Sequence, residues 1–331
     1  MTHGRKRLST VLTAAAALAA TLAISLVPMS PTFAEPDIDE VQGRVDRLYH
    51  QAEEAQERWH DANLELSELK RDLAALQADQ RRQEEQLELV QDEVEQSVVR
   101  QYEGESLTAV GEVVVSDDPS ALLGQLTTMS AYNDLQADLF DDYAVELKAL
   151  QIRKQATSKR TSEVAAVEAQ MAKEKKAVDA KLAEAKELLA RLKEEERQAI
   201  LSRGTSRIIP STVPASGRAA VAVRTALAQV GDSYVYGAMG PDAFDCSGLT
   251  MYAWGAAGVG LPHSSSAQFG SGPRIAASAL QPGDLVFYYS PISHVGMYIG
   301  NGLIVHAANP GTDVVVSGLY SMPYVGAVRP G

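Results

Sequence analysis

Apolar residues recur through the N-terminal half of the chain at alternating steps of four and three, the spacing of a coiled-coil seam. The longest run begins at Val41 and continues to about Val94, with mostly Glu, Gln, Arg and Asp between its apolar positions. Its first members are Val41, Val45, Leu48, Ala52, Ala55, Trp59, Ala62, Leu66, Leu69, Leu73 and Leu76. Gln80 and Gln83 then occupy the seam, where they weaken packing and can specify the register. This pattern predicts a coiled-coil helix rather than a helix lying on a globular core.

A second helical stretch is expected over about 120–202. Its seven-residue repeat consists of Leu150, Thr157, Val164, Met171, Val178, Ala185 and Leu192. We place Leu147, Leu182 and Leu189 at the other seam position, which is polar at Lys154, Thr161, Glu168 and Lys175. Two such helices most simply fold back as an antiparallel hairpin, each arm about 90 Å long at about 1.5 Å per residue. A dimeric coil would satisfy the same seam.

The break between the helices, about 104–119, carries Leu107, Val110 and 113–115 among acidic residues. Such a patch at the end of a stalk is a candidate docking surface. A short helix packed onto the end of the hairpin is the alternative.

The pattern changes in the C-terminal third, which is rich in Gly, Ala, Ser and Val. Helices are expected over 218–230 and 246–257, followed by short alternating strands from 285 to 328. We therefore predict an α+β domain with a small antiparallel sheet over 218–331. Residues 35–203 form the coiled-coil domain, and the Pro- and Ser-containing segment 204–217 is the linker.

Residues 1–34 have the layout of a signal peptide: Arg5, Lys6 and Arg7, an Ala- and Leu-rich stretch, and a cleavage motif ending at Ala34. A retained membrane anchor is the alternative. The chain carries a net charge of −13. Residues 35–217, the coil and linker, hold −15, because 1–34 carries +3 and 218–331, with four Arg, five Asp and no Lys or Glu, carries −1. An acidic stalk excludes nucleic acid as a partner and leaves protein contact as its use.

Cys246 is the only cysteine of the 331 residues, and it follows Asp245 at the expected start of a helix. Exported proteins usually pair their cysteines, and one thiol cannot form an internal disulfide. The N–H groups and the dipole of a first helical turn lower a thiol pKa, which favours a nucleophile. A small buried hydrophobic side chain is the alternative.

His294 and His306 lie on two expected strands joined by the turn signal Asn301-Gly302. A register with both histidines on one face makes His294 a general base and His306 the residue that orients it. Two unrelated packed histidines are the structural alternative. Zinc bound by Cys246, His263, His294 and His306 is a further alternative, but no second cysteine or closely spaced ligand pair supports it. We predict neither a metal nor a cofactor.

Six stretches of the C-terminal third, in the same order, resemble the NlpC/p60 family of papain-like cell-wall cysteine peptidases. They are 233–238, 244–249, 261–262, 281–287, 294–300 and 305–307. Each is weak alone, and together they are specific. The resemblance implies a papain-like fold with Cys246 as nucleophile, His294 as general base and His306 as the third polar residue.

The resemblance also implies that the Tyr234 hydroxyl lies beside the thiol and helps to hold the substrate or the oxyanion. We place Ser247, His263 and Ser265 with it as substrate-side residues. The family often has an arginine after the Leu-Pro pair, where this chain has the run 263–266, His-Ser-Ser-Ser. Substrate recognition can therefore differ from the family pattern.

Members of this family cut peptidoglycan stem peptides, typically between D-glutamate and the following diamino acid. The resemblance thus implies a secreted endopeptidase of the γ-D-Glu–meso-diaminopimelate bond, acting in cell-wall remodelling and daughter-cell separation. A coiled coil joined to such an enzyme resembles the actinobacterial division hydrolases controlled by the membrane complex FtsEX, in which the coil restrains the enzyme. A non-catalytic wall-binding scaffold and an acyl-transferring relative are the alternatives.

Overall fold

The computed structural model describes residues 38–103, 119–192, 194, 196–198, 213 and 215–331. The expected signal segment, the apolar break after residue 103 and most of the linker lie outside the described residues. Among the described helices, none combines the length and apolar character needed to cross a membrane.

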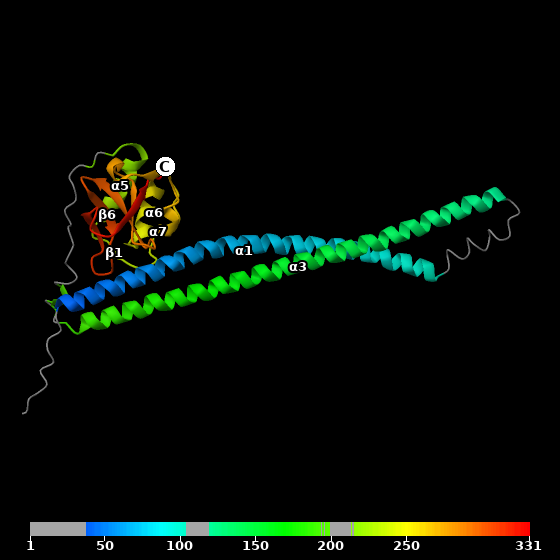
Figure 1. Ribbon diagram of the computed structural model, residues 1–331, viewed down its shortest axis with the longest axis horizontal. Coiled ribbons are helices and arrows are strands. Elements are labelled where there is room, and N and C mark those ends of the chain that lie inside the picture. Colours follow the sequence, from blue (N-terminus) through cyan, green and yellow to red (C-terminus); the bar gives the residue numbers. More distant parts are fainter. Residues whose placement is uncertain (1–37, 104–118, 193, 195, 199–212, 214) are drawn as a thin grey trace, which may run out of the picture. The chain divides into compact units, whose positions relative to one another are not determined.

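The helices α1 (Ile38–Tyr102) and α3 (Pro119–Ala190) lie side by side and run in opposite directions (Figure 1). Val41 and Val45, near the start of α1, pack against Leu189 and Leu192, around the C-terminal end of α3. Farther along, Gln83 of α1 donates hydrogen bonds to Glu146. The predicted antiparallel coiled-coil hairpin is confirmed.

The second seam position of α3 lies one residue earlier than expected over 154–175. Arg153, Arg160, Val167 and Glu174 face α1, whereas Lys154, Thr161 and Glu168 are exposed. The charged residues at the observed position pair across the helices, Arg153 with Asp79 at 2.8 Å, Arg160 with Asp72 at 3.6 Å and Glu174 with Arg58 at 3.1 Å.

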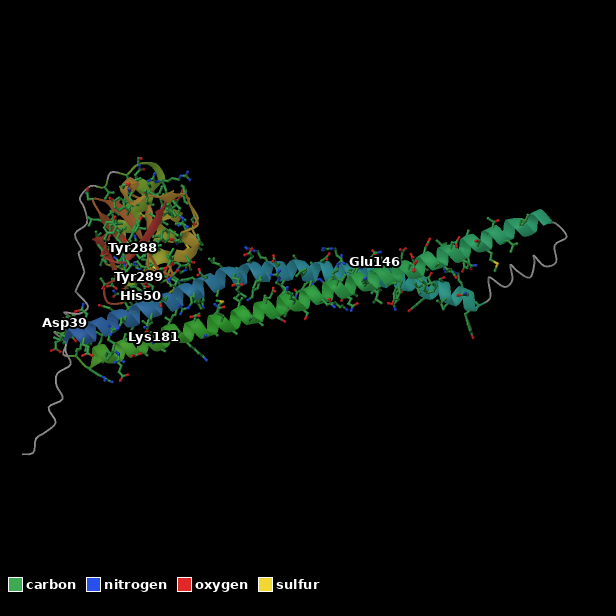
Figure 2. All side chains as sticks on the ribbon, in the orientation of Figure 1. Asp39, His50, Glu146, Lys181, Tyr288 and Tyr289 are labelled. Carbon is green, nitrogen blue, oxygen red and sulfur yellow. The ribbon has the colours of Figure 1, made fainter. Side chains whose placement is uncertain are left out.

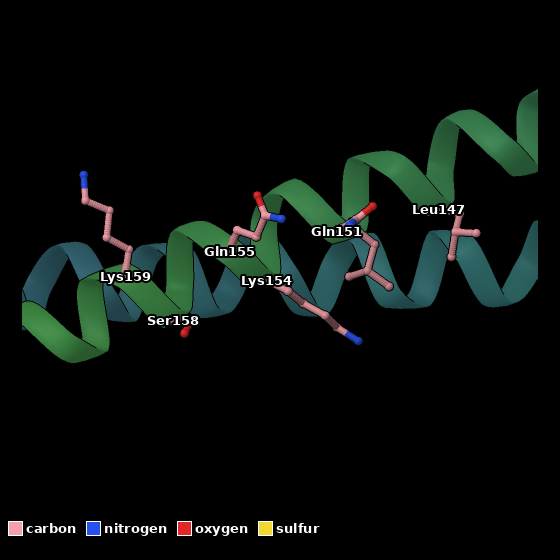
Figure 3. Close-up of a pocket in the computed structure, with 7 residues that line it drawn as sticks. Leu147, Gln151, Lys154, Gln155, Ser158 and Lys159 are labelled. Carbon is pink, nitrogen blue, oxygen red and sulfur yellow. The ribbon is translucent and has the colours of Figure 1, made fainter.

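The part of α3 over residues 147–159 borders a groove. A groove of 730 Å³ lies beside this stretch (Figure 3). Its lining residues are Leu147, Leu150, Gln151, Lys154, Gln155, Ser158 and Lys159. Leu147, expected in the seam, is 48% exposed.

The C-terminal domain is the predicted α+β unit. Its six-stranded sheet has the order β3-β8-β4-β5-β6-β7, and every neighbouring pair is antiparallel. The strands are β3 (Arg274–Ile275), β4 (Leu285–Tyr288), β5 (His294–Gly300), β6 (Leu303–Ala307), β7 (Val314–Gly318) and β8 (Tyr324–Val328). The other elements are α5 (Gly217–Ala228), α6 (Cys246–Ala256), the short α7 (Ser265–Gln268), a 3-10 turn (Ala277–Ala279), and the parallel pair β1 (Ser233–Tyr234) and β2 (Ala243–Phe244).

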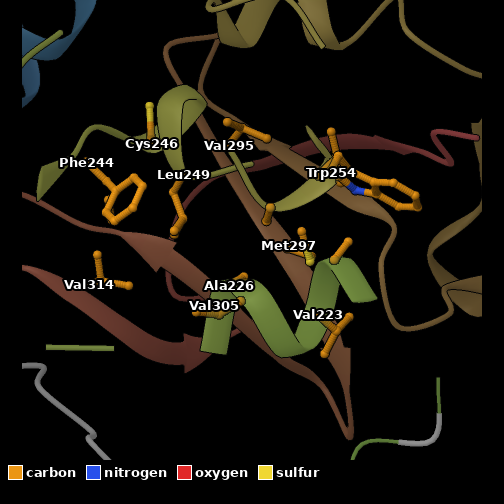
Figure 4. Close-up of a cluster of buried hydrophobic side chains, with 14 of the residues drawn as sticks. Val223, Ala226, Phe244, Cys246, Leu249, Trp254, Val295, Met297, Val305 and Val314 are labelled. Carbon is orange, nitrogen blue, oxygen red and sulfur yellow. The ribbon is translucent and has the colours of Figure 1, made fainter. Parts of the chain in front are cut away.

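The core of this domain lies between the sheet and the helices α5 and α6 (Figure 4). Leu249 and Trp254 of α6 pack against Leu285, Val295 and Met297 of the sheet, all at most 2% exposed. A second cluster covers the opposite face of the sheet around Tyr288 and Ile304. Both clusters draw only on residues from 213 onward, so the domain holds a core of its own.

Two backbone features place the chemistry. Asn301 and Gly302 both have positive φ, 54° and 70°, which makes the tight β5–β6 turn that the sequence indicated. Gly248 lets the first turn of α6 approach the backbone of Ala238, because a Cβ there would lie 2.2 Å from the Ala238 carbonyl oxygen. The turn pairs β5 with β6, and the close contact seats the first turn of α6 against the segment between β1 and β2.

Candidate active site

Cys246 occupies the first position of α6, directly after the capping residue Asp245. The Asp245 carboxylate accepts a hydrogen bond from the Gly248 N–H at 2.7 Å, as expected of an N-cap. The thiol is 1% exposed and lies 4.0 Å from the Ser293 carbonyl oxygen. The Val295 N–H also donates to it. The nucleophile candidate therefore sits where α6 meets the start of β5.

His294 and His306 form a connected pair beside the thiol. His294 Nε2 lies 2.8 Å from His306 Nδ1, and His306 Nε2 lies 3.0 Å from the Ser317 hydroxyl. Burial and the nearby His294 hold the pKa of His306 well below its usual range, so His306 is neutral. The structure brings together the three residues predicted as catalytic. Their roles remain predictions.

Glu53 of α1 contacts the ring nitrogen of His294 that His306 leaves free. The Glu53 carboxylate lies 2.5 Å from His294 Nδ1. Ligand atoms of Glu53, Cys246 and His294 all lie within 4.8 Å of one another. Although burial alone would raise it, the pKa of Glu53 is lowered by His294 and His50. A carboxylate therefore lies beside both the base candidate and the nucleophile candidate.

Glu57, one turn further along α1, fills the other side of the site. One carboxylate oxygen accepts hydrogen bonds from the Ser265 N–H and hydroxyl, both at 2.6 Å. The other accepts from the Ser247 hydroxyl at 3.1 Å and lies 3.8 Å from the Cys246 sulfur. Burial, with the charge of Asp245 adding to it, raises the pKa of Glu57 to about 7.

The prediction of a lowered thiol pKa is wrong for this arrangement. Burial raises the pKa of Cys246 well above its usual value, and the charges of Glu53, Glu57 and Asp245 raise it further. The helix start and the Val295 N–H act in the opposite sense but are outweighed. With α1 in place the thiol is therefore protonated.

Further contacts fix α1 on the C-terminal domain at both sides of the thiol. Asp61 accepts hydrogen bonds from the hydroxyls of Ser264 and Ser266 at 2.5 and 2.6 Å. At the other side, the Tyr236 hydroxyl donates to the Tyr49 carbonyl oxygen at 2.9 Å. His50 stacks on Tyr289 with ring centroids 4.0 Å apart (Figure 2).

The remaining predicted residues lie around this centre. Burial raises the pKa of Tyr234 well above its usual range, and the charge of Glu53 adds to this. His263 does not reach the thiol directly but bonds the Asp245 carboxylate at 2.9 Å. A cavity of 340 Å³ remains between α1 and the domain, lined among others by Glu53, His294 and His306.

The residues of α1 in this site were not predicted from the sequence. Glu53, Glu57, His60 and Asp61 lie outside the apolar seam, where charged residues of a coiled coil normally face water. Their spacing of four, three and one places them on one helix face, which is the signal that was available. No rule of heptad composition would have predicted their burial.

The C-terminal domain is similar to known proteins. Residues 231–327 match the NlpC/P60 family. A probable endopeptidase of Mycobacterium tuberculosis is 49% identical over 102 residues, which are 31% of this chain and 26% of the relative. One of Corynebacterium glutamicum is 43% identical over 116 residues, 35% of this chain and 56% of the relative. The chain thus spans about a quarter to about half of the length of these relatives.

Solved structures with a similar domain include the NlpC/p60 domain of the peptidoglycan hydrolase SagA. It is 33% identical, with a TM-score of 0.32, over 34% of this chain and 97% of that chain. The peptidoglycan hydrolase RipB of Mycobacterium tuberculosis is 30% identical, with a TM-score of 0.32, over 34% of this chain and 64% of that chain. Residues 231–327 are therefore an NlpC/P60 domain.

Proposed function

We propose that the chain is a secreted cysteine endopeptidase of peptidoglycan whose active site is closed by its own coiled coil. The observation that carries this proposal is the set of Cys246, His294 and His306, assembled at the junction of α6 and β5 within an NlpC/P60 domain. Relatives of this domain are named probable endopeptidases.

The chemistry follows from the positions of these groups once α1 has left. His294 Nδ1, freed from Glu53, takes the proton of Cys246, while His306 holds the other ring nitrogen. The thiolate attacks the amide carbonyl, and N–H groups at the start of α6 stabilise the oxyanion. His294 then protonates the leaving amine, and water hydrolyses the thioester.

The contacts of Glu57 support a substrate with a carboxylate next to the scissile bond. Three donors, the Ser265 N–H and the hydroxyls of Ser265 and Ser247, converge on the Glu57 carboxylate 3.8 Å from the thiol. A stem peptide carries such a free carboxylate on a γ-linked D-glutamate. The γ-D-Glu–meso-diaminopimelate bond is therefore the proposed site of cleavage, with Glu57 in the place of the substrate carboxylate.

The same contacts support inhibition by α1. Glu53 contacts the general base His294, and Glu57 takes the hydrogen bonds that are proposed for the substrate. Both carboxylates raise the pKa of the thiol. Inhibition of this kind requires a partner that removes α1. Exposed apolar side chains at the far end of the hairpin offer a contact for one, including Val99, Tyr102, Leu123 and Leu135, each at least 52% exposed. A division complex of the FtsEX kind is the proposed partner, acting outside the cytoplasmic membrane during daughter-cell separation.

Digestion of peptidoglycan by three proteins tests the proposal, with released stem peptides identified by mass spectrometry. They are residues 213–331, the full chain, and residues 213–331 with Cys246→Ala. The short form begins at 213 because Val213 and Ala215 pack against the core of the domain. We expect cleavage by the isolated domain, little by the full chain, and none by the Cys246→Ala form.

Equal cleavage by the full chain and the isolated domain would contradict the inhibitory role of α1 and leave the endopeptidase proposal standing. No cleavage by the isolated domain would contradict the endopeptidase proposal itself. A wall-binding scaffold would then be favoured, and sedimentation of the domain with insoluble peptidoglycan would test it.

A further inference from the structure

A second group of polar side chains joins α1 to the C-terminal domain beside the nucleophile site. His60 of α1 places Nε2 3.0 Å from the Asp245 carboxylate. His263 places its own Nε2 2.9 and 3.0 Å from the two oxygens of that carboxylate. The two rings lie side by side with centroids 3.8 Å apart. His60 and Asp245 are each 1% exposed, and His263 is partly buried.

The three ligand atoms lie within 4.8 Å of one another. Two histidine nitrogens and one carboxylate oxygen form a ligand set that zinc favours, with a fourth position left for another ligand. In a tetrahedral site with bonds of about 2.0–2.1 Å, neighbouring ligand atoms lie about 3.3 Å apart. The observed nitrogen–oxygen distances need to lengthen by only a few tenths of an ångström to reach this value.

Hydrogen bonds alone do not satisfy the polar atoms of this group. His60 Nε2 lies 3.0 Å from an acceptor, Asp245, and 3.2 Å from a donor, the Gln56 amide nitrogen, but one ring nitrogen cannot both donate and accept. Reversing the Gln56 amide, whose two ends are assigned rather than observed, turns its oxygen toward His60. That oxygen, or a water molecule, can be the fourth ligand of a cation held by His60, Asp245 and His263.

The Asp245 carboxylate is already oriented for such a role. The Gly237 N–H donates to one of its oxygens at 2.9 Å and the Gly248 N–H to the other at 2.7 Å. Fixed outer contacts of this kind orient metal-binding carboxylates.

We propose that His60, Asp245 and His263 bind a zinc ion that clamps α1 onto the C-terminal domain. One ligand comes from the coiled coil and two come from the domain, so the bound ion cross-links them. Zinc then favours the arrangement in which Glu53 and Glu57 fill the nucleophile site. The metal site stands on its own geometry, whereas its effect on cleavage rests on the proposed function.

The test is calorimetric titration of zinc chloride into the metal-free full chain carrying Cys246→Ala. This substitution removes the thiol from the other possible group, Glu53 with Cys246 and His294. We expect one zinc ion per chain. His60→Ala or His263→Ala in the same background should weaken binding at least about tenfold, because even outer partners of a metal site have that effect. Glu65→Ala, which changes an exposed carboxylate of α1, is the control and should leave the affinity unchanged.

Two further measurements separate loss of a ligand from loss of structure. Circular dichroism compares the helix content of the His60→Ala chain with that of its parent. Residues 213–331 with Cys246→Ala lack His60 but carry no further substitution. They should also bind zinc at least about tenfold more weakly than the full Cys246→Ala chain.

The proposal is overturned if the Cys246→Ala chain binds no zinc, or if loss of His60 and of His263 leaves the affinity unchanged. Binding that disappears with Cys246→Ala would place the ion at the nucleophile instead and would also overturn it. No step of this test involves cleavage. Its failure and failure of the endopeptidase proposal are therefore distinguishable.

Discussion

The helix α1 is buried on two faces, and the two faces are built differently. Toward α3 it presents apolar side chains such as Val45, Ala52 and Leu66. Toward the C-terminal domain it presents Glu53, Glu57 and His60, which are also buried. Apolar burial is favourable in itself, whereas buried charges are stabilising only while their partners remain in place. The first face therefore makes a lasting pair of helices, and the second makes a contact that can be released.

The largest effect should come from removing both carboxylates from the releasable face. In the full chain, Glu53→Ala with Glu57→Ala removes the partner of His294 Nδ1 and of the donors around Ser265. Truncating one side of a buried charged pair costs about 2–5 kcal/mol. We expect alkylation of Cys246 by iodoacetamide to accelerate at least about a hundredfold, corresponding to about 3 kcal/mol. The control is Glu54→Ala with Glu65→Ala, which changes two partly or fully exposed acids of the same helix. An unchanged rate in the double variant would show that these carboxylates do not hold α1 on the site.

The matching change on the lasting face is Leu66→Ala. Leu66 is 8% exposed and packs with Ala62, Leu69, Val164 and Val167. Truncating a buried leucine costs about 2–5 kcal/mol, and this seam is only two helices thick, so we expect about 2 kcal/mol. Urea unfolding followed by helical circular dichroism measures it. Leu89→Ala, at a side chain 62% exposed, should change the unfolding free energy by less than about 0.5 kcal/mol.

The sequence predicted the lasting face and not the releasable one. The seven-residue repeat determines which side of α1 meets α3, because apolar spacing is a local property of the helix. Glu57 is buried only because Ser247 and Ser265, nearly two hundred residues later, meet its carboxylate. The strand pair and the turn at Gly302 were also predictable, because local residue spacing and turn chemistry specify them, as local spacing specifies the heptads. The raised pKa of the Cys246 thiol was not predictable in this way, because it depends on α1.

Release of α1 should also respond to pH, through Glu57. Docking raises the pKa of this group from 4.5 to about 7, so the contribution of its proton to docking is fully present below pH 4.5 and is lost as the pH rises through 7. Glu53 has a lowered pKa and acts in the opposite sense, but only as the pH falls through the acid range. Between pH 5.5 and 8, docking should weaken about thirtyfold, a shift of about 2 kcal/mol.

Trp59 offers the measurement, because its ring lies 5.4 Å from that of His60 at the contact with the domain. Its emission should change with pH in the full chain and much less in the Glu57→Gln chain. Trp59→Phe gives the background from Trp254, which is buried in the domain core. If the emission of the parent and Glu57→Gln chains changed identically with pH, Glu57 would not be the titrating group.

Ser265→Ala should have a smaller effect on the same contact. It removes the hydroxyl that donates to Glu57 but keeps the backbone N–H, so one of the two bonds to that carboxylate oxygen remains. A hydrogen bond to a charged group contributes about 1.5–3 kcal/mol, and a partner that keeps its second bond should lose about 1 kcal/mol. Cys246 alkylation in the full chain should accelerate about fivefold. In the isolated domain KM for stem peptides should rise while kcat changes little, which a purely structural role of Ser265 would not produce.

The smallest effect should come from an ion pair on the exposed edge of the lasting face. Lys70 of α1 lies 2.8 Å from Glu168 of α3, a closer charge pair than many in the active site, but both side chains are about half exposed. Water competes for both charges and ordering two long side chains costs entropy, so such pairs contribute about 0–1 kcal/mol. We expect Lys70→Gln to change the urea unfolding free energy by less than about 0.5 kcal/mol and Cys246 alkylation not at all. A loss comparable to that of Leu66→Ala would mean that charge pairing, and not the apolar seam, holds α1 to α3, and the two faces would then differ only in what they contact.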